Sequence, residues 1–115
     1  MAFMFTTSTQ AQDGITQTFA GCLGRTSAEL EHAWLMGTPN ADALQTQYTA
    51  FDDLLQASQP PEDARAILKY RIEVKMAHAS LLTNASFEQD ETRATRSRYL
   101  AARYMSACET LLLNG

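Results

Sequence analysis

Apolar residues recur along this chain at spacings of three and four, which place them on one face of an α-helix. Four segments show this pattern, and residues that end or begin helices separate them. The chain has no β-branched run, and no Asn-Gly or Asp-Gly turn joins two alternating segments. The pattern therefore predicts an all-α protein.

The first helical segment covers residues 15–36, with Asp13 before it as an acceptable N-cap. Two glycines, Gly21 and Gly24, each weaken a helix interior by about 1 kcal/mol relative to Ala. Thr26 and Glu29 have the spacing of a capping box, which could restart a helix. The segment is thus either one long helix or two collinear pieces with a kink near Gly24. Its expected buried face is Ile15, Phe19, Cys22, Thr26, Leu30 and Ala33.

Three further helices follow. Gly37 ends the first helix, and we expect a second helix over residues 41–57. A third helix should run from the prolines at 60–61 to about Asn84. Ser86 should cap the fourth helix, with Glu88 in its capping box. Short links make successive helices antiparallel. Residues 13–115 are therefore predicted to form one domain, an antiparallel up-down-up-down four-helix bundle. The expected buried face of the second helix is Leu44, Tyr48, Phe51 and Leu55, and that of the third helix is Ile67, Tyr70, Val74, Ala77 and Leu81. On the fourth helix the expected buried face is Ser97, Leu100, Tyr104, Ala107 and Leu111, with Ala101 and Cys108 beside it.

Residues 1–12 differ from the rest, because a short apolar start is followed by a run of Thr, Ser and Gln. Small residues surround a potential cleavage point after Ala11, as in a secretory signal peptide. The apolar part is short, however, and no basic residue precedes Arg25. Two interpretations stay open: the remnant of a signal peptide that starts upstream, or a disordered N-terminus.

Composition narrows the classes of function. The 115 residues are 45% hydrophobic, which is enough to bury a core in one domain. The net charge of −4 argues against a nucleic-acid binder. No apolar run approaches the roughly 20 residues that cross a membrane, so we expect a soluble protein. Residues 1–61 carry six acidic and one basic side chain, whereas residues 62–115 carry seven and eight, which indicates acidic helices packed beside basic ones.

The two cysteines are candidates for a disulfide. Cys22 and Cys108 lie on or beside the expected faces of the first and fourth helices, at levels that differ by about 6 Å. A bond that closes so long a loop contributes about 4–5 kcal/mol in the chain-entropy model. Disulfides persist in oxidising compartments, so this pairing and an exported protein support each other. The alternative is a pair of buried free thiols.

A metal site is a weaker hypothesis. Glu29 and His32 have the i, i+3 spacing of carboxylate di-iron bundles, and His78 is expected at a similar level. The pattern is incomplete, because no second Glu-x-x-His exists and the other helices offer no matching Glu. Neither a catalytic motif nor a haem-attachment motif is present, so we predict no cofactor and no enzyme activity.

The fourth helix carries a basic patch of Arg93, Arg96 and Arg103 with tyrosines among them. These arginines either form a solvated face that pairs with the acidic helices or bind an anionic partner.

Together these features predict a small periplasmic or secreted, non-enzymatic helical bundle that acts as a structural or protein-interaction module. Two alternatives remain. One is a cytoplasmic adaptor or chaperone-like dimer with free thiols and an apolar patch at Leu111–Leu113. The other is a metal- or cofactor-binding bundle. The protein partner and the choice between monomer and homodimer are left open.

Overall fold

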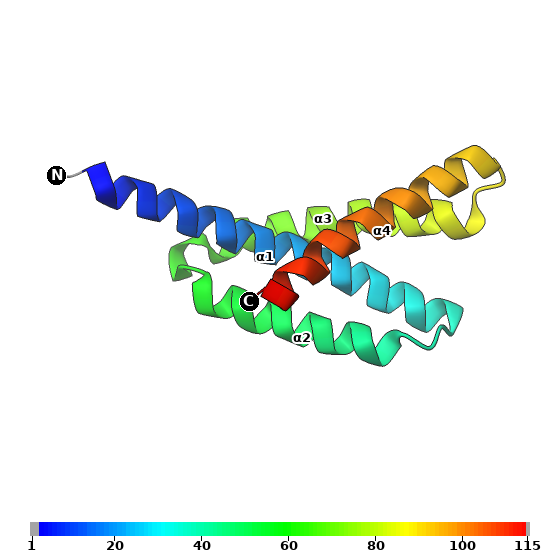
Figure 1. Cartoon of the computed structure of the whole chain (residues 1–115), viewed down its shortest axis with the longest axis horizontal. Coiled ribbons are helices and arrows are strands. Elements are labelled where there is room, and N and C mark those ends of the chain that lie inside the picture. Colours follow the sequence, from blue (N-terminus) through cyan, green and yellow to red (C-terminus); the bar gives the residue numbers. More distant parts are fainter. Residues whose placement is uncertain (1–2, 115) are drawn as a thin grey trace.

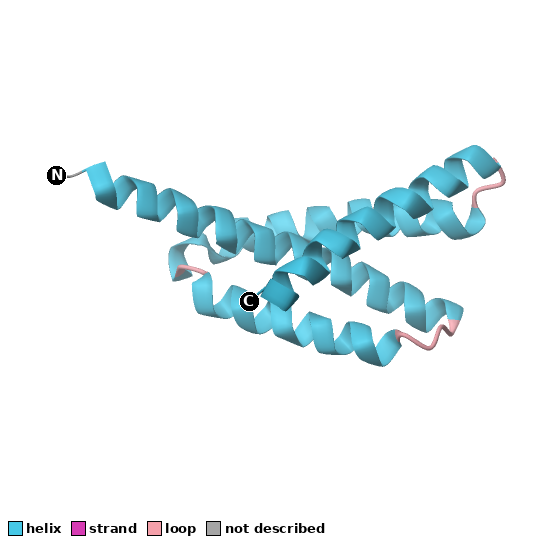
Figure 2. Cartoon of the chain, viewed as in Figure 1, coloured by secondary structure: helices cyan, strands magenta, loops and turns pink. Residues whose placement is uncertain are grey.

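A computed structural model describes the backbone of residues 3–114 and the burial of residues 14–113. This part of the chain contains helices and no strand (Figures 1 and 2). Successive long helices run in opposite directions, which confirms the predicted up-down-up-down four-helix bundle. The elements are α1 (Phe3–Met36), α2 (Ala41–Ser58), the short 3-10 turn η1 (Pro61–Asp63), α3 (Ala64–Phe87) and α4 (Glu91–Asn114).

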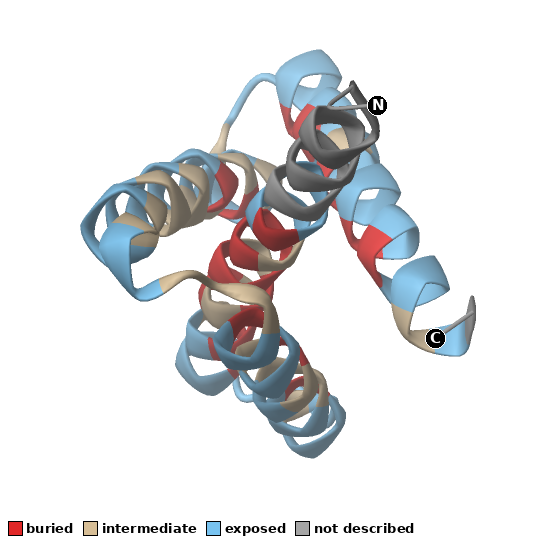
Figure 3. Ribbon diagram, turned by 90° about the vertical axis from the view of Figure 1, so that its left-hand side faces the viewer, coloured by how far each residue is buried: buried red, intermediate tan, exposed pale blue. Residues whose placement is uncertain are grey.

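Helix α1 lies at the centre of the bundle, with the other three helices around it (Figure 3). Both α2 and α3 pack along α1, whereas α4 pairs mainly with α3 and meets α1 over a shorter stretch. Each of the three apolar clusters in the described core includes residues of α1. The clusters are Ala20, Cys22, Leu23, Phe51, Leu55 and Cys108; Leu30, Ala33, Leu44 and Met105; and Ala28, Leu82 and Ala101.

Small residues let α3 come close to α1. A Cβ atom at Gly24 would lie 2.5 Å from the carbonyl oxygen of Arg71 and 3.1 Å from the amide nitrogen of Lys75. Both contacts are with backbone atoms, which cannot relieve the clash by a change of rotamer as a side chain can. At Gly21 the nearest atoms belong to the Tyr70 ring, at an ordinary 3.5 Å. Gly24 is therefore the point at which the two helix backbones approach each other.

The helix ends are only partly as predicted. Gly37 has φ +66°, and the Thr38 amide donates to the Ala33 carbonyl at 3.0 Å, so the expected stop after Met36 is confirmed. Helix α1 starts at Phe3, ten residues before the expected cap at Asp13. It runs without interruption through Gly24, which settles the choice between one helix and two pieces. The signal-peptide interpretation of residues 1–12 stays a prediction, and residues 1–2 lie outside the described residues.

The predicted capping box at the start of the fourth helix is wrong. Helix α3 continues through Ser86 to Phe87 and packs on α1 for a further turn, where the Ser86 hydroxyl is 2.9 Å from Nε2 of His32. Asp90 caps α4 instead, because its Oδ1 accepts from the amides of Thr92 and Arg93 at 3.0 and 3.2 Å.

The buried faces of α3 and α4 are also rotated from the predicted ones. His78 and Leu82 are buried in α3, whereas Ala77 is exposed. In α4 the buried residues include Ala94, Ala101 and Met105, while Tyr104 and Ala107 are exposed. The reason in α3 is that a polar residue, His78, occupies the centre of the buried face, and apolar periodicity cannot reveal it.

Replacing Gly24 by Ala should destabilise the protein by about 2 kcal/mol, because the new methyl group forces α3 away from α1. Gly21→Ala is the matched control. Its methyl group meets only ordinary contacts, and Ala favours a helix interior by up to about 1 kcal/mol over Gly. The measurement is urea denaturation followed by circular dichroism. Equal stabilities of the two variants would contradict the close approach at Gly24.

Candidate functional site

A disulfide joins α1 to α4 through Cys22 and Cys108, whose Cα atoms are 5.6 Å apart. The described residues contain no free cysteine. Both half-cystines are buried, and they pack with Leu23, Phe51 and Leu55 in the largest core cluster. The predicted pairing is therefore present in the structure, at the place where α4 meets the centre of α1.

A polar cluster beside the disulfide connects α1 with α3. Arg25 lies 3.0 Å from Nδ1 of the fully buried His78, and Oε1 of Glu29 lies 3.2 Å from Nε2 of the same imidazole. A guanidinium group can only donate hydrogen bonds, so Nδ1 must be the acceptor. In this arrangement the ring hydrogen is on Nε2, and Nε2–H donates a hydrogen bond to Oε1 of Glu29. Both ring nitrogens are thus used to hold the two helices together.

Arg25 also connects the polar cluster to α4. Its guanidinium carbon lies 3.6 Å from the centre of the Tyr104 ring, a stacked cation–π contact. Partial burial lowers the pKa of Arg25, while its proximity to Tyr104 and Tyr70 acts in the opposite direction. The stacked ring and the His78 acceptor offset part of the cost of removing this charge from water.

The structure brings together two of the three candidate metal ligands. Glu29 contacts His78, but His32 points to Ser86 on α3, where its Nε2 lies 2.9 Å from the hydroxyl oxygen. Among the described residues, no three His, Cys, Asp or Glu side chains are placed to hold a metal ion. Arg25 lies where a metal would have to contact Nδ1 of His78, and a guanidinium cation does not fit next to a metal cation.

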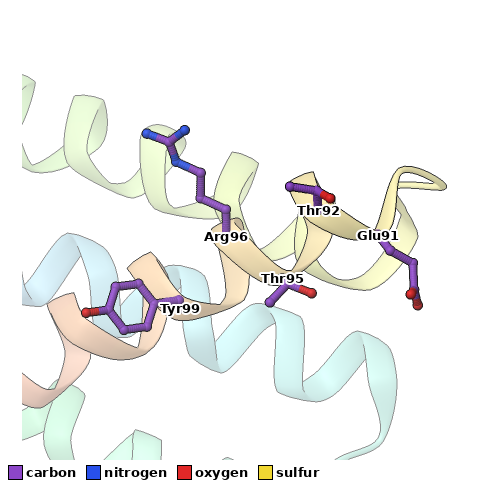
Figure 4. A pocket seen from close by; sticks show the side chains of 5 residues that line it. All are labelled: Glu91, Thr92, Thr95, Arg96 and Tyr99. Carbon is purple, nitrogen blue, oxygen red and sulfur yellow. The ribbon is translucent and has the colours of Figure 1, made fainter.

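The basic patch on α4, Arg93, Arg96 and Arg103, is exposed to solvent. Arg96 lines an open hollow of about 560 Å³ with Glu91, Thr92, Thr95 and Tyr99 (Figure 4). All five residues belong to α4, and Glu91 places a negative charge at one end. Arg103 donates to the Tyr99 hydroxyl at 3.1 Å, whereas Arg93 does not line the hollow. An anionic partner for this patch stays a prediction.

Sequence analysis missed the roles of Arg25 and Tyr104. Arg25 is the only basic residue before position 65, and it is next to Thr26 on the expected buried face. A single basic side chain so close to a buried face indicates that a buried acceptor receives its hydrogen bonds, and this signal would have directed attention to His78. Tyr104 was expected in the core, but its ring instead covers Arg25 and remains 42% exposed.

Several large apolar side chains remain exposed. At the end of α1 they are Trp34, Leu35 and Met36, and on one side of α3 they are Leu68, Ile72 and Met76. Leu113 on α4 is 85% exposed. Within the described residues no helix is both long enough and apolar enough to cross a membrane.

Comparisons of the chain with protein-family models, with curated proteins and with solved structures find no match.

Replacing Arg25 by Met should destabilise the protein by about 2 kcal/mol, because buried His78 loses its donor and Glu29 loses a nearby positive charge. Arg103→Met is the matched control. Arg103 also contacts a tyrosine ring but lies on the surface, so its loss should cost less than about 0.5 kcal/mol. Urea denaturation of the oxidised proteins gives both values. An equal loss of unfolding free energy in the two variants would show that the polar cluster contributes no more to stability than a surface contact does.

Proposed function

We propose that this protein is a non-enzymatic helical module that works through protein contacts in an oxidising compartment, either the periplasm or the extracellular space. The observation that carries the proposal is the buried Cys22–Cys108 disulfide. Structural disulfides are common in exported proteins and rare in the cytosol, where thiols are kept reduced.

The position of the disulfide supports a structural purpose. It lies among apolar side chains that are all but excluded from solvent, and neither half-cystine has a second cysteine near it in sequence. A catalytic disulfide needs an accessible thiolate. Burial favours a crosslink that is made once, during folding, and then stabilises the bundle by about 4–5 kcal/mol in the chain-entropy model.

The histidines support a non-enzymatic role. Both nitrogens of His78 are occupied by Arg25 and Glu29, and His32 is hydrogen-bonded to Ser86. These contacts join α1 to α3. His32 does lie beside a hydroxyl, that of Ser86, but this pair is exposed and shows, among the described residues, no carboxylate hydrogen-bonded to the imidazole, so it lacks the third group that orients the base in a catalytic triad. The exposed apolar side chains on α1 and α3 are instead typical of a surface that contacts another protein.

Mass spectrometry of the protein purified from its native host without reductant tests the proposal. The oxidised chain should weigh about 2 Da less than the reduced chain, because disulfide formation removes two hydrogens. Alkylation before reduction should add no label, and alkylation after reduction should add two. The same spectrum should show that residues 1–11 have been removed. Two free thiols and a retained Met1 would contradict the exported module and favour the cytoplasmic alternative.

A further inference from the structure

The middle of α4 carries a concentrated positive charge. Residues 92–108 contain no acidic residue, and their basic residues, all exposed, are Arg93, Arg96, Arg98 and Arg103. The acidic residues of α4, Glu91 and Glu109, stand at the two ends of this stretch, and Glu88 and Asp90 precede it in the loop. A chain with a net charge of −4 thus presents a basic segment on one of its helices.

The described part of the chain does not neutralise these arginines. Its ion pairs, Lys75–Glu31 and His78–Glu29, involve no residue of α4. Helix α2 has three aspartates and no basic residue, but it packs on α1, whereas α4 packs mainly on α3. Helix α3 is itself basic, with Glu73 as its one acidic residue against Arg65, Lys69, Arg71 and Lys75. The arginines of α4 are therefore available to an external anionic partner.

Two of the arginines share the outer face of α4. Arg96, Tyr99 and Arg103 follow one another at spacings of three and four, so they lie on one side of the helix. The opposite side is the buried one, with Ala94, Ala101 and Cys108. The rise of the helix places the Cα atoms of Arg96 and Arg103 about 10 Å apart along its axis.

Tyr99 helps to position Arg103. Its hydroxyl accepts a hydrogen bond from Nη1 of Arg103 at 3.1 Å, and the remaining N–H groups of the guanidinium stay free to donate. The outer basic face, defined as Arg96, Tyr99 and Arg103, is thus a row of two cations with an exposed aromatic ring between them.

We propose that the outer basic face is the contact surface for an acidic α-helix of another protein, with carboxylates seven residues apart. This inference rests on the proposed role in protein contacts and adds the surface and the chemistry of the partner. Side chains at positions i and i+7 of a helix lie on one face, also about 10 Å apart, so two carboxylates can meet both guanidinium groups at once. Each guanidinium group can bind its carboxylate through two parallel hydrogen bonds.

The side chains around the outer basic face favour a protein partner over an anionic membrane surface. A helix that lies on a bilayer inserts large apolar side chains next to its basic ones. Between residues 92 and 106 the exposed large hydrophobic side chains are Tyr99 and Tyr104, and none is aliphatic. Tyr104 stacks on Arg25 of the same chain. The contact is polar and small, so the binding should be weak and should decrease as the salt concentration rises.

Isothermal titration calorimetry of the oxidised full chain at low ionic strength tests the inference. The probe is a synthetic alanine-rich helical peptide with two glutamates seven residues apart. It should bind at least about tenfold more tightly than the same peptide with glutamines in their place. A third peptide carries its two glutamates five residues apart, on different sides of the helix, and should bind about threefold more weakly than the first.

Variants of the protein locate the contact. Arg96→Gln and Arg103→Gln should each weaken binding of the first peptide by about threefold to tenfold. Arg65→Gln is the matched control, because it removes the same charge from an exposed position on α3, and it should change binding by less than about twofold. Glu91→Gln should strengthen binding by about twofold, since Glu91 repels an acidic partner beside Arg96. Circular dichroism of each variant confirms that the helices are retained.

Four results would overturn the inference. The first is that the peptide with glutamates seven residues apart does not bind, or binds no better than the glutamine peptide. The second is that Arg65→Gln weakens binding as much as Arg96→Gln does. The third is binding to phosphatidylglycerol vesicles that depends on Arg96 and exceeds peptide binding, and the fourth is self-association in sedimentation that depends on Arg96. Failure here is separate from failure of the proposed function, because the native mass reports the disulfide and the N-terminus whatever the partner.

Discussion

The packing of three helices on α1 is the constraint on which the rest of this structure depends. A helix that is contacted from several sides needs small residues where its neighbours come close. Gly24 meets the α3 backbone, and Ala20, Ala28 and Ala33 contribute to the three core clusters. Larger residues at these positions would separate the helices, and no other helix could replace α1 as the shared neighbour.

Two specific contacts then fix the positions of α3 and α4 along α1, which apolar packing alone would not determine. Helix α3 is tied to α1 by Arg25, His78 and Glu29, and a shift of α3 by one turn would leave a buried imidazole without its partners. Helix α4 meets α1 over a short stretch, and there the tie is covalent, between Cys22 and Cys108. The bundle therefore uses a hydrogen-bonded tie on one side and a disulfide on the other.

Sequence reasoning recovered the elements whose signals are local. The four helices, the stop at Gly37 and the level match between Cys22 and Cys108 follow from periodicity, turn chemistry and the rise of a helix. It failed where a residue far away in the sequence determines the role of a side chain. Ser86 looks like a cap until His32 is seen beside it, and Glu29 and His78 look like candidate metal ligands until Arg25 is placed beside His78. The polar cluster was missed because hydrophobic patterning assigns a polar residue such as Arg25 to the surface.

Amide hydrogen exchange of the oxidised and reduced protein is the most direct test of this account. Because the disulfide is the principal tie between α1 and the second half of α4, reduction should increase exchange most strongly in residues 101–113. The increase there should be about tenfold or more, whereas the part of α3 that packs on Gly24 should change least. An equal loss of protection in all four helices, or no loss in residues 101–113, would contradict the account.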